Sequence, residues 1–188
     1  QINDSTNAVL QVNSGDFDFG NAESTSAKAY FDRMYVQHKF GKNVSLTGGR
    51  YMQKFGTGLS YFDTFDGAQL NVGNQKLNLQ AAYGYMVAGA FNGYATDKQA
   101  EVGYVGASAK LGHATQVGGF WAHLSNGSIT TADGTKKEIG DGKNQYDYSN
   151  VYGFNANVNY NKAWIGGEWI KASGMDDSDA WMAGVGYG

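Results

Sequence analysis

The segment YGFNANVNY, residues 152–160, alternates between two kinds of side chain. Its even positions carry Tyr, Phe, Ala, Val and Tyr, whereas its odd positions carry only Gly and Asn. A period of two belongs to a β-strand whose two faces differ. We therefore expect a strand here with one apolar face, which has an aromatic residue at each end, and one small, amide-rich face.

The same period recurs along most of the chain. Leu77, Leu79 and Tyr83, for example, alternate with Asn78 and Gln80. No segment combines a period of 3.6 residues with the capping residues that are typical of a helix. The fold is therefore predicted to be all-β, with about ten strands. Their expected bounds are 1–12, 28–40, 44–52, 68–73, 76–88, 98–111, 115–124, 150–160, 162–172 and 179–188.

The connections between these strands alternate in length. The tight ones are residues 41–43, 74–75, 112–114 and 161–162, and the long ones are 13–27, 53–67, 89–97, 125–149 and 173–178. Short turns at one end of an antiparallel meander and long loops at the other are the plan of an outer-membrane β-barrel.

Charge is sorted between the same two ends. Thirteen of the 17 acids fall in or beside the long connections. The turn end is expected to carry no acid, and its five lysines are Lys39, Lys42, Lys76, Lys110 and Lys162. Because the lipid-facing middle of a membrane barrel must stay uncharged, this sorting favours a transmembrane β-barrel over a soluble all-β fold.

Composition excludes several other classes of protein. A net charge of -3 does not provide the basic face that binds nucleic acid. Without cysteine the chain has no disulfide, zinc–thiolate site or cysteine nucleophile. The three histidines lack the spacing of a metal site, so neither a metal nor a cofactor is expected. The 188 residues are expected to form a single domain, 1–188.

The polar face of the predicted strands consists of Asn, Gly, Ser, Gln and Ala, which suits the wall of a water-filled channel. A barrel of ten strands fills its lumen with bulky or charged side chains, and these residues would leave it empty. A barrel of about sixteen strands fits them better and requires more than 188 residues. The chain is therefore expected to be a segment of a longer protein.

Residues 29–69, AYFDRMYVQHKFGKNVSLTGGRYMQKFGTGLSYFDTFDGAQ, resemble the region around the constriction loop of general diffusion porins. In those proteins a strand with Arg leads through a tight turn into a strand ending in Gly-Arg-aromatic, and a long loop with Gly and acids follows. The form Gly-Arg-Tyr-x4-Gly-x-Gly-Leu-x-Tyr-x-Asp-x-Phe-Asp-Gly is most similar to the porin barrels of diderm Firmicutes. In that family the barrel usually follows an S-layer-homology domain and a coiled coil, which these residues do not contain.

This resemblance implies a passive diffusion channel for small hydrophilic solutes and ions, with no enzymatic activity. It also implies a homotrimer in the bacterial outer membrane, in contact with lipid and lipopolysaccharide. In porins a long loop folds into the pore, and acids on the loop face basic residues on the wall. The resulting transverse field selects solutes by charge.

By the same resemblance, Arg33 and Arg50 match the arginines of the pore wall, and Asp63 and Asp66 fall in the constriction loop. The predicted loop, residues 53–67, is short for a loop that narrows a pore. The alternative is that it only covers part of the rim of the barrel. The expected lining and constriction residues are Arg33, Arg50, Asp63, Asp66, Lys39 and Glu168.

The face on which Arg50 lies has two interpretations. With the hairpin centred on Lys42, Arg33 lies on the polar side of the sheet and Arg50 on the apolar side. Either a bulge at Gly48-Gly49 turns Arg50 to the polar side, or Arg50 lies at the rim beside Asp32.

Two other functions stay open at this point. One is a non-conducting structural or adhesive barrel of the outer membrane that helps to tether the envelope. More distantly, His123 and Asp147 are candidates for the catalytic pair of a barrel-embedded protease, although no motif arranges them. The acidic run 174–179 lacks the carboxylate spacing of a calcium loop, so a hydrated tip is expected there.

Overall fold

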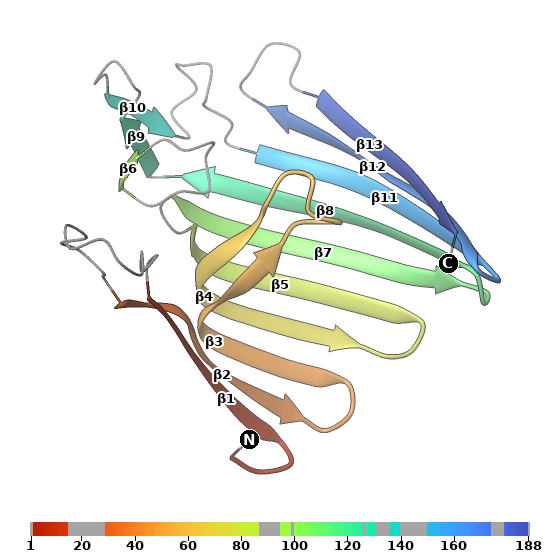
Figure 1. Cartoon of the computed structure of the whole chain (residues 1–188), viewed down its shortest axis with the longest axis horizontal. Coiled ribbons are helices and arrows are strands. Elements are labelled where there is room, and N and C mark those ends of the chain that lie inside the picture. The colour runs from red at the N-terminus through yellow and green to blue at the C-terminus, as the bar shows by residue number, and fades with distance from the viewer. Residues whose placement is uncertain are drawn as a thin grey trace, which may run out of the picture.

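The computed structural model describes residues 2–14, 29–86, 95–98, 100–125, 127–130, 136–139, 150–173 and 179–187. In these ranges every regular element is a β-strand, as the sequence predicts (Figure 1). Ten strands form one antiparallel sheet, and three short ones form a second. A helix with the length and apolarity to cross a membrane is not found in the described ranges.

The large sheet is a meander in which neighbouring strands follow one another along the chain. Its strands are β1 (Thr6–Ser14), β2 (Ala29–Phe40), β3 (Val44–Lys54), β4 (Phe62–Gly73), β5 (Leu77–Met86), β7 (Glu101–Leu111), β8 (Thr115–Ser125), β11 (Asn150–Tyr160), β12 (Ala163–Ser173) and β13 (Asp179–Tyr187). The small sheet contains β6 (Ala95–Lys98), β9 (Gly127–Thr130) and β10 (Lys136–Ile139). The hairpin turns β2–β3, β4–β5, β7–β8 and β11–β12 share one border of the large sheet, called the turn end below (Figure 1). The opposite border is the loop end.

The pairing corrects three of the predicted loops. β4 begins at Phe62, so residues 62–67 form a strand. Their acids and glycine indicated a loop, but each of them pairs with a residue of β3, which extends to Lys54. The short strands β6, β9 and β10 also lie in or overlap segments predicted as loops, 89–97 and 125–149, and they pair only with one another.

The large sheet bends back on itself. Residues 55–61, which connect β3 and β4, form hydrogen bonds with Glu168 on β12. β12 is the sixth strand from β3, about 29 Å away along the sheet at a spacing of about 4.8 Å. A contact between them therefore crosses the hollow of a curved sheet, where Figure 1 shows the connection. The face that this connection touches is the concave face.

The convex face is apolar and exposed, as the alternation predicts. Leu46, Leu79 and Phe154 are 42%, 46% and 56% exposed. Paired residues continue this surface from strand to strand, with Leu46 beside Leu70, Val72 beside Leu79, Val105 beside Trp121, and Phe154 beside Trp169. The described residues provide no second layer that covers it.

The concave face divides into two halves. Towards the turn end it carries the predicted amides, which are Gln37, Gln69, Asn71, Asn78, Gln80, Gln116, Asn155, Asn157 and Asn159. Towards the loop end it is a hydrophobic core, whose larger members are Tyr51, Phe55, Phe65, Met86, Tyr104, Phe120 and Leu124. The expectation of a small, polar face along the whole strand is therefore wrong for the loop-end half.

Candidate functional site

The connection between β3 and β4, residues 55–61, forms a compact turn on the concave face and is called the inner loop below. Phe55 donates its backbone N–H to the carbonyl of Tyr61 at 3.0 Å, and Gly58 donates to the carbonyl of Phe55 at 2.9 Å. Gly56 and Gly58 have φ angles of 56° and 107°, a left-handed backbone that glycine adopts without strain. The inner loop therefore has a defined conformation of its own.

Glu168 holds the inner loop against β12. Its Oε1 accepts a hydrogen bond from the backbone N–H of Thr57 at 2.8 Å. Its Oε2 accepts bonds from the Thr57 hydroxyl at 2.5 Å and from the N–H of Leu59 at 3.1 Å. Glu168 is only 3% exposed, and a buried carboxylate is stable only when it is hydrogen-bonded or paired. The inner loop and Glu168 thus satisfy each other's polar groups.

Aromatic rings hold the other flank of the inner loop. Phe55 stacks on Tyr104 of β7, with ring centroids 4.8 Å apart, and also contacts Phe120 of β8 at 6.1 Å. Within the loop, the ring of Tyr61 lies 4.9 Å from that of Phe55. The inner loop is therefore fixed by apolar packing on β7 and β8 and by the Glu168 carboxylate on β12.

Replacing Gly56 with alanine should dislodge the inner loop. The new methyl group would overlap Glu168 Oε1 and lie 2.7 Å from a ring carbon of Phe120. The left-handed φ would add about 1–2 kcal/mol for a residue other than glycine. Trypsin should then cleave faster after Lys54, the exposed residue that precedes the loop.

Gly41→Ala is the matched control, because Gly41 also has a left-handed φ, 76°, but no atom lies within 4 Å of an added methyl group. It should leave cleavage after Lys54 unchanged. If Gly56→Ala is cleaved no faster than Gly41→Ala, the contact between the inner loop and Glu168 is not what holds the loop.

Arg33 lies on the concave face, as predicted. The register pairs it with Gln11, and its neighbour on the same face, Tyr35, contacts the ring of core residue Tyr51. The guanidinium Nε lies 3.8 Å from the carboxylate of Asp32. A cationic group is thus held on the hollow side of the sheet.

Arg50 lies on the convex face. The register of β3 runs without a shift through Gly48 and Gly49, so no bulge turns Arg50 inward. Its Nε and Nη2 donate to the two carboxylate oxygens of Asp66 at 2.7 Å and 2.6 Å, and its Nη1 donates to the carbonyl of Phe31 at 3.2 Å. Of the two interpretations of Arg50, the one that relies on a bulge is therefore wrong.

This ion pair belongs to a polar row on the convex face near the loop end. Pairing across β3, β4, β5 and β7 aligns Arg50, Asp66, Tyr85 and Glu101. The Tyr85 hydroxyl donates to the Glu101 carboxylate at 3.4 Å. Apart from Phe62, which begins β4 at the loop end, the exposed large apolar residues of these strands lie between this row and the turn end.

Asp63 and Lys39 lie at opposite ends of the concave face. Asp63 pairs with Gln53 near the loop end, and Lys39 pairs with Ser45 beside the first turn. The prediction that Asp63 and Asp66 belong to a loop is wrong, because both are in β4. The six predicted site residues do not meet in one cluster, since Arg50 and Asp66 face away from the other four.

Sequence reasoning missed the residues that touch Glu168. Thr57 and Leu59 carry no charge, and the porin-like pattern that includes Leu59 assigned it no role. The closely spaced Gly56 and Gly58 were the available signal of a folded turn. Asp147 and the acids at 176–177 lie outside the described residues. In the part of the chain that the structure describes, no group of three or more His, Asp or Glu could hold a metal ion.

No protein-family model matches this sequence, and no curated protein is significantly similar to it. The geometry offers one distinctive feature, a curved sheet whose concave face is polar towards the turn end and is crossed nearer the loop end by a fixed loop.

Proposed function

We propose that this chain forms part of the wall of a porin, a passive channel for small hydrophilic solutes and ions in a bacterial outer membrane. The observation that carries the proposal is the arrangement of the two faces of the large sheet. The convex face is apolar and exposed, whereas the turn-end half of the concave face is lined with amides. In a soluble antiparallel sheet the solvated face is polar. In a membrane barrel, lipid covers the apolar outer face and water fills the inside.

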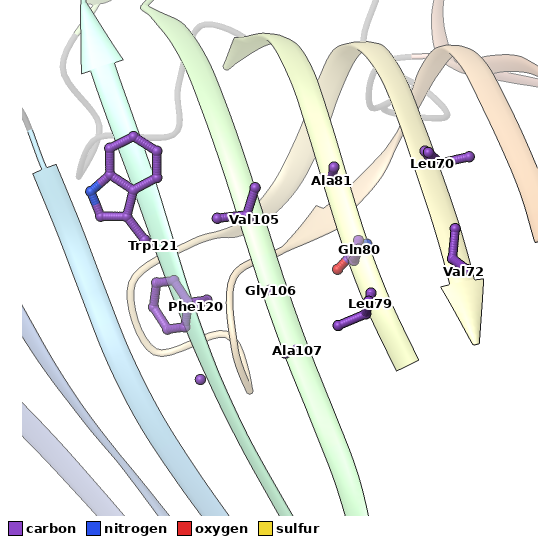
Figure 2. Close-up of a pocket in the computed structure, with 11 residues that line it drawn as sticks. Leu70, Val72, Leu79, Gln80, Ala81, Val105, Gly106, Ala107, Phe120 and Trp121 are labelled. Atoms are coloured by element: carbon purple, nitrogen blue, oxygen red, sulfur yellow. The ribbon is translucent and has the colours of Figure 1, made fainter. Parts of the chain in front are cut away.

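A shallow apolar hollow on the convex face supports contact with lipid. A shallow hollow of about 610 Å³ extends over β4, β5, β7 and β8 (Figure 2). Leu79, Val105 and Trp121 line it around the small residues Ala81 and Ala107. Such a surface is apolar enough for acyl chains, and none of its described lining residues is charged.

Aromatic residues on the convex face support the same assignment. Towards the loop end, Trp121 pairs with Tyr152, and Trp169 pairs with Trp181. Tyr160 lies at the turn end of the same surface and is 71% exposed. Trp and Tyr are enriched at the two levels where a membrane meets water.

The open edges of the sheet support a larger barrel. Among the described strands, β1 and β13 each pair on one side only. An unpaired strand edge is unstable in lipid, because its backbone groups find no hydrogen-bond partner there. Further strands that complete a barrel of about sixteen would pair with these edges. The resemblance of residues 29–69 to general porins supports a homotrimer.

The inner loop supplies the constriction in this proposal. It crosses the concave side from β3 to β12 and is held there by Glu168. Arg33 and Asp63, of opposite charge, lie on the same concave face. The field between unlike charges in a narrow passage then acts on passing ions.

Single-channel recording in planar bilayers tests the function. The purified protein should insert and produce discrete steps of current. A structural or adhesive barrel would enter lipid vesicles and resist extraction, but would give no current. Protein that is shown to be inserted and yet conducts no ion would refute the channel and favour the structural alternative.

A further inference from the structure

Positive charge gathers at the turn end of the sheet. Its five lysines, Lys39, Lys42, Lys76, Lys110 and Lys162, lie in or beside the four hairpin turns. Among the described residues, one acid, Asp4, also lies at this border. Its position follows from the next residue, Ser5, whose backbone carbonyl accepts a hydrogen bond from the N–H of Lys39. The prediction that the turn end carries no acid is therefore wrong, but the five lysines still outnumber Asp4, so the charge at this border is positive.

A pocket of about 520 Å³ opens between the β2–β3 and β4–β5 hairpins. The residues that line it include two lysines and several amide residues, Lys39, Lys42, Asn43, Asn71, Gln75 and Asn78. Asn71 and Asn78 belong to the concave face, so the pocket opens towards the hollow. None of its described lining residues carries a carboxylate.

The chemistry of this pocket suits an anion. Lys39 and Lys42 supply ammonium donors, and the amides supply neutral N–H donors. Neither ion pair found among the described residues involves these lysines. Of the carboxylates on the concave face, Asp63 lies near the loop end. Glu168 lies at the middle of β12, opposite Asn155, and its carboxylate is already bonded to the inner loop.

We propose that this pocket attracts small anions, and that the channel therefore conducts anions in preference to cations. The inference rests on the proposed channel function. Lys110 extends the site, because it pairs with Gln116 and so lies on the concave face as well. Fixed charges at a channel mouth raise the local concentration of oppositely charged solutes. The effect should be strong at about 0.1 M salt and weak at about 1 M, because the screening length falls from about 10 Å to about 3 Å.

Reversal potentials under a KCl gradient measure this preference in the full protein. In dilute salt we expect chloride to be favoured over potassium on the order of two- to tenfold. Lys39→Gln should lower this ratio, and the double variant with Lys42→Gln should bring it close to one. Lys171→Gln is the matched control for the single variant, because Lys171 lies on the convex face opposite Tyr152, and it should leave the ratio unchanged.

The possible results distinguish failure of the anion site from failure of the channel function. A channel that conducts but favours cations would overturn the anion site and leave the porin function intact. So would a channel whose anion preference is the same with and without Lys39 and Lys42. Inserted protein that carries no current would overturn the channel function, and the anion preference with it.

Discussion

Replacing Glu168 with alanine should increase the single-channel conductance. The inner loop would lose three hydrogen bonds, and the N–H groups of Thr57 and Leu59 would lose their acceptor. A hydrogen bond to a charged group contributes about 1.5–3 kcal/mol. Since about 1.4 kcal/mol changes an equilibrium tenfold, the fraction of time that the loop spends away from β12 should rise at least about tenfold. The open current should therefore rise and become noisier.

Glu101→Ala is the control for this experiment. It removes a carboxylate of the same kind from the convex face, where the Tyr85 hydroxyl is bonded to it. Its conductance should match that of the unmodified channel. Equal conductance of Glu168→Ala and Glu101→Ala would show that Glu168 does not set the width of the passage.

Replacing Phe65 with alanine should destabilise the fold far more than replacing Phe154. Phe65 is fully buried in the concave core, with its ring 5.7 Å from that of Tyr51. Truncation of such a residue costs about 3–5 kcal/mol. Phe154 is 56% exposed on the convex face, and in the proposed membrane barrel detergent would cover this position before and after the change. Urea unfolding in detergent micelles, followed by tryptophan fluorescence, compares the two free energies of unfolding.

Similar losses for Phe65→Ala and Phe154→Ala would contradict this account. They would mean that both faces of the sheet are packed against protein, as in the interior of a soluble sandwich. A small loss at Phe65 alone would show that the inner loop and the loop-end core contribute little to stability.

The faces of the first hairpin were predictable from the sequence. A period of two leaves only two choices for each side chain, and the tight turn around Lys42 fixes the register between its strands. The observed pairing of Met34 with Arg50 follows from that turn. Arg33 and Arg50 therefore lie on opposite faces, as counting from the turn indicates.

The loop-end core was not predictable in the same way. Tyr104 and Phe120 alternate with Val105 and Trp121, so both faces of these strands carry apolar residues at this end. Which face is buried depends on the inner loop, which covers the concave face. The position of the inner loop in turn depends on a contact between Thr57 and Glu168, which are 111 positions apart in the chain. Local alternation contains no information about such a contact.

The orientation of the two faces is tested most directly by cysteine labelling, since the chain has no cysteine of its own. Asn157 and Val158 are neighbours in β11 that point to the concave and convex faces, where they pair with Gln116 and Thr115. Asn157→Cys and Val158→Cys variants in lipid bilayers would be treated with a charged thiol reagent that does not cross membranes. We predict that the Asn157→Cys variant reacts and loses conductance, whereas the Val158→Cys variant is protected and reacts only with a lipid-soluble reagent. Reaction of the Val158→Cys variant with the charged reagent, together with protection of the Asn157→Cys variant, would contradict the central claim that water lines the concave face.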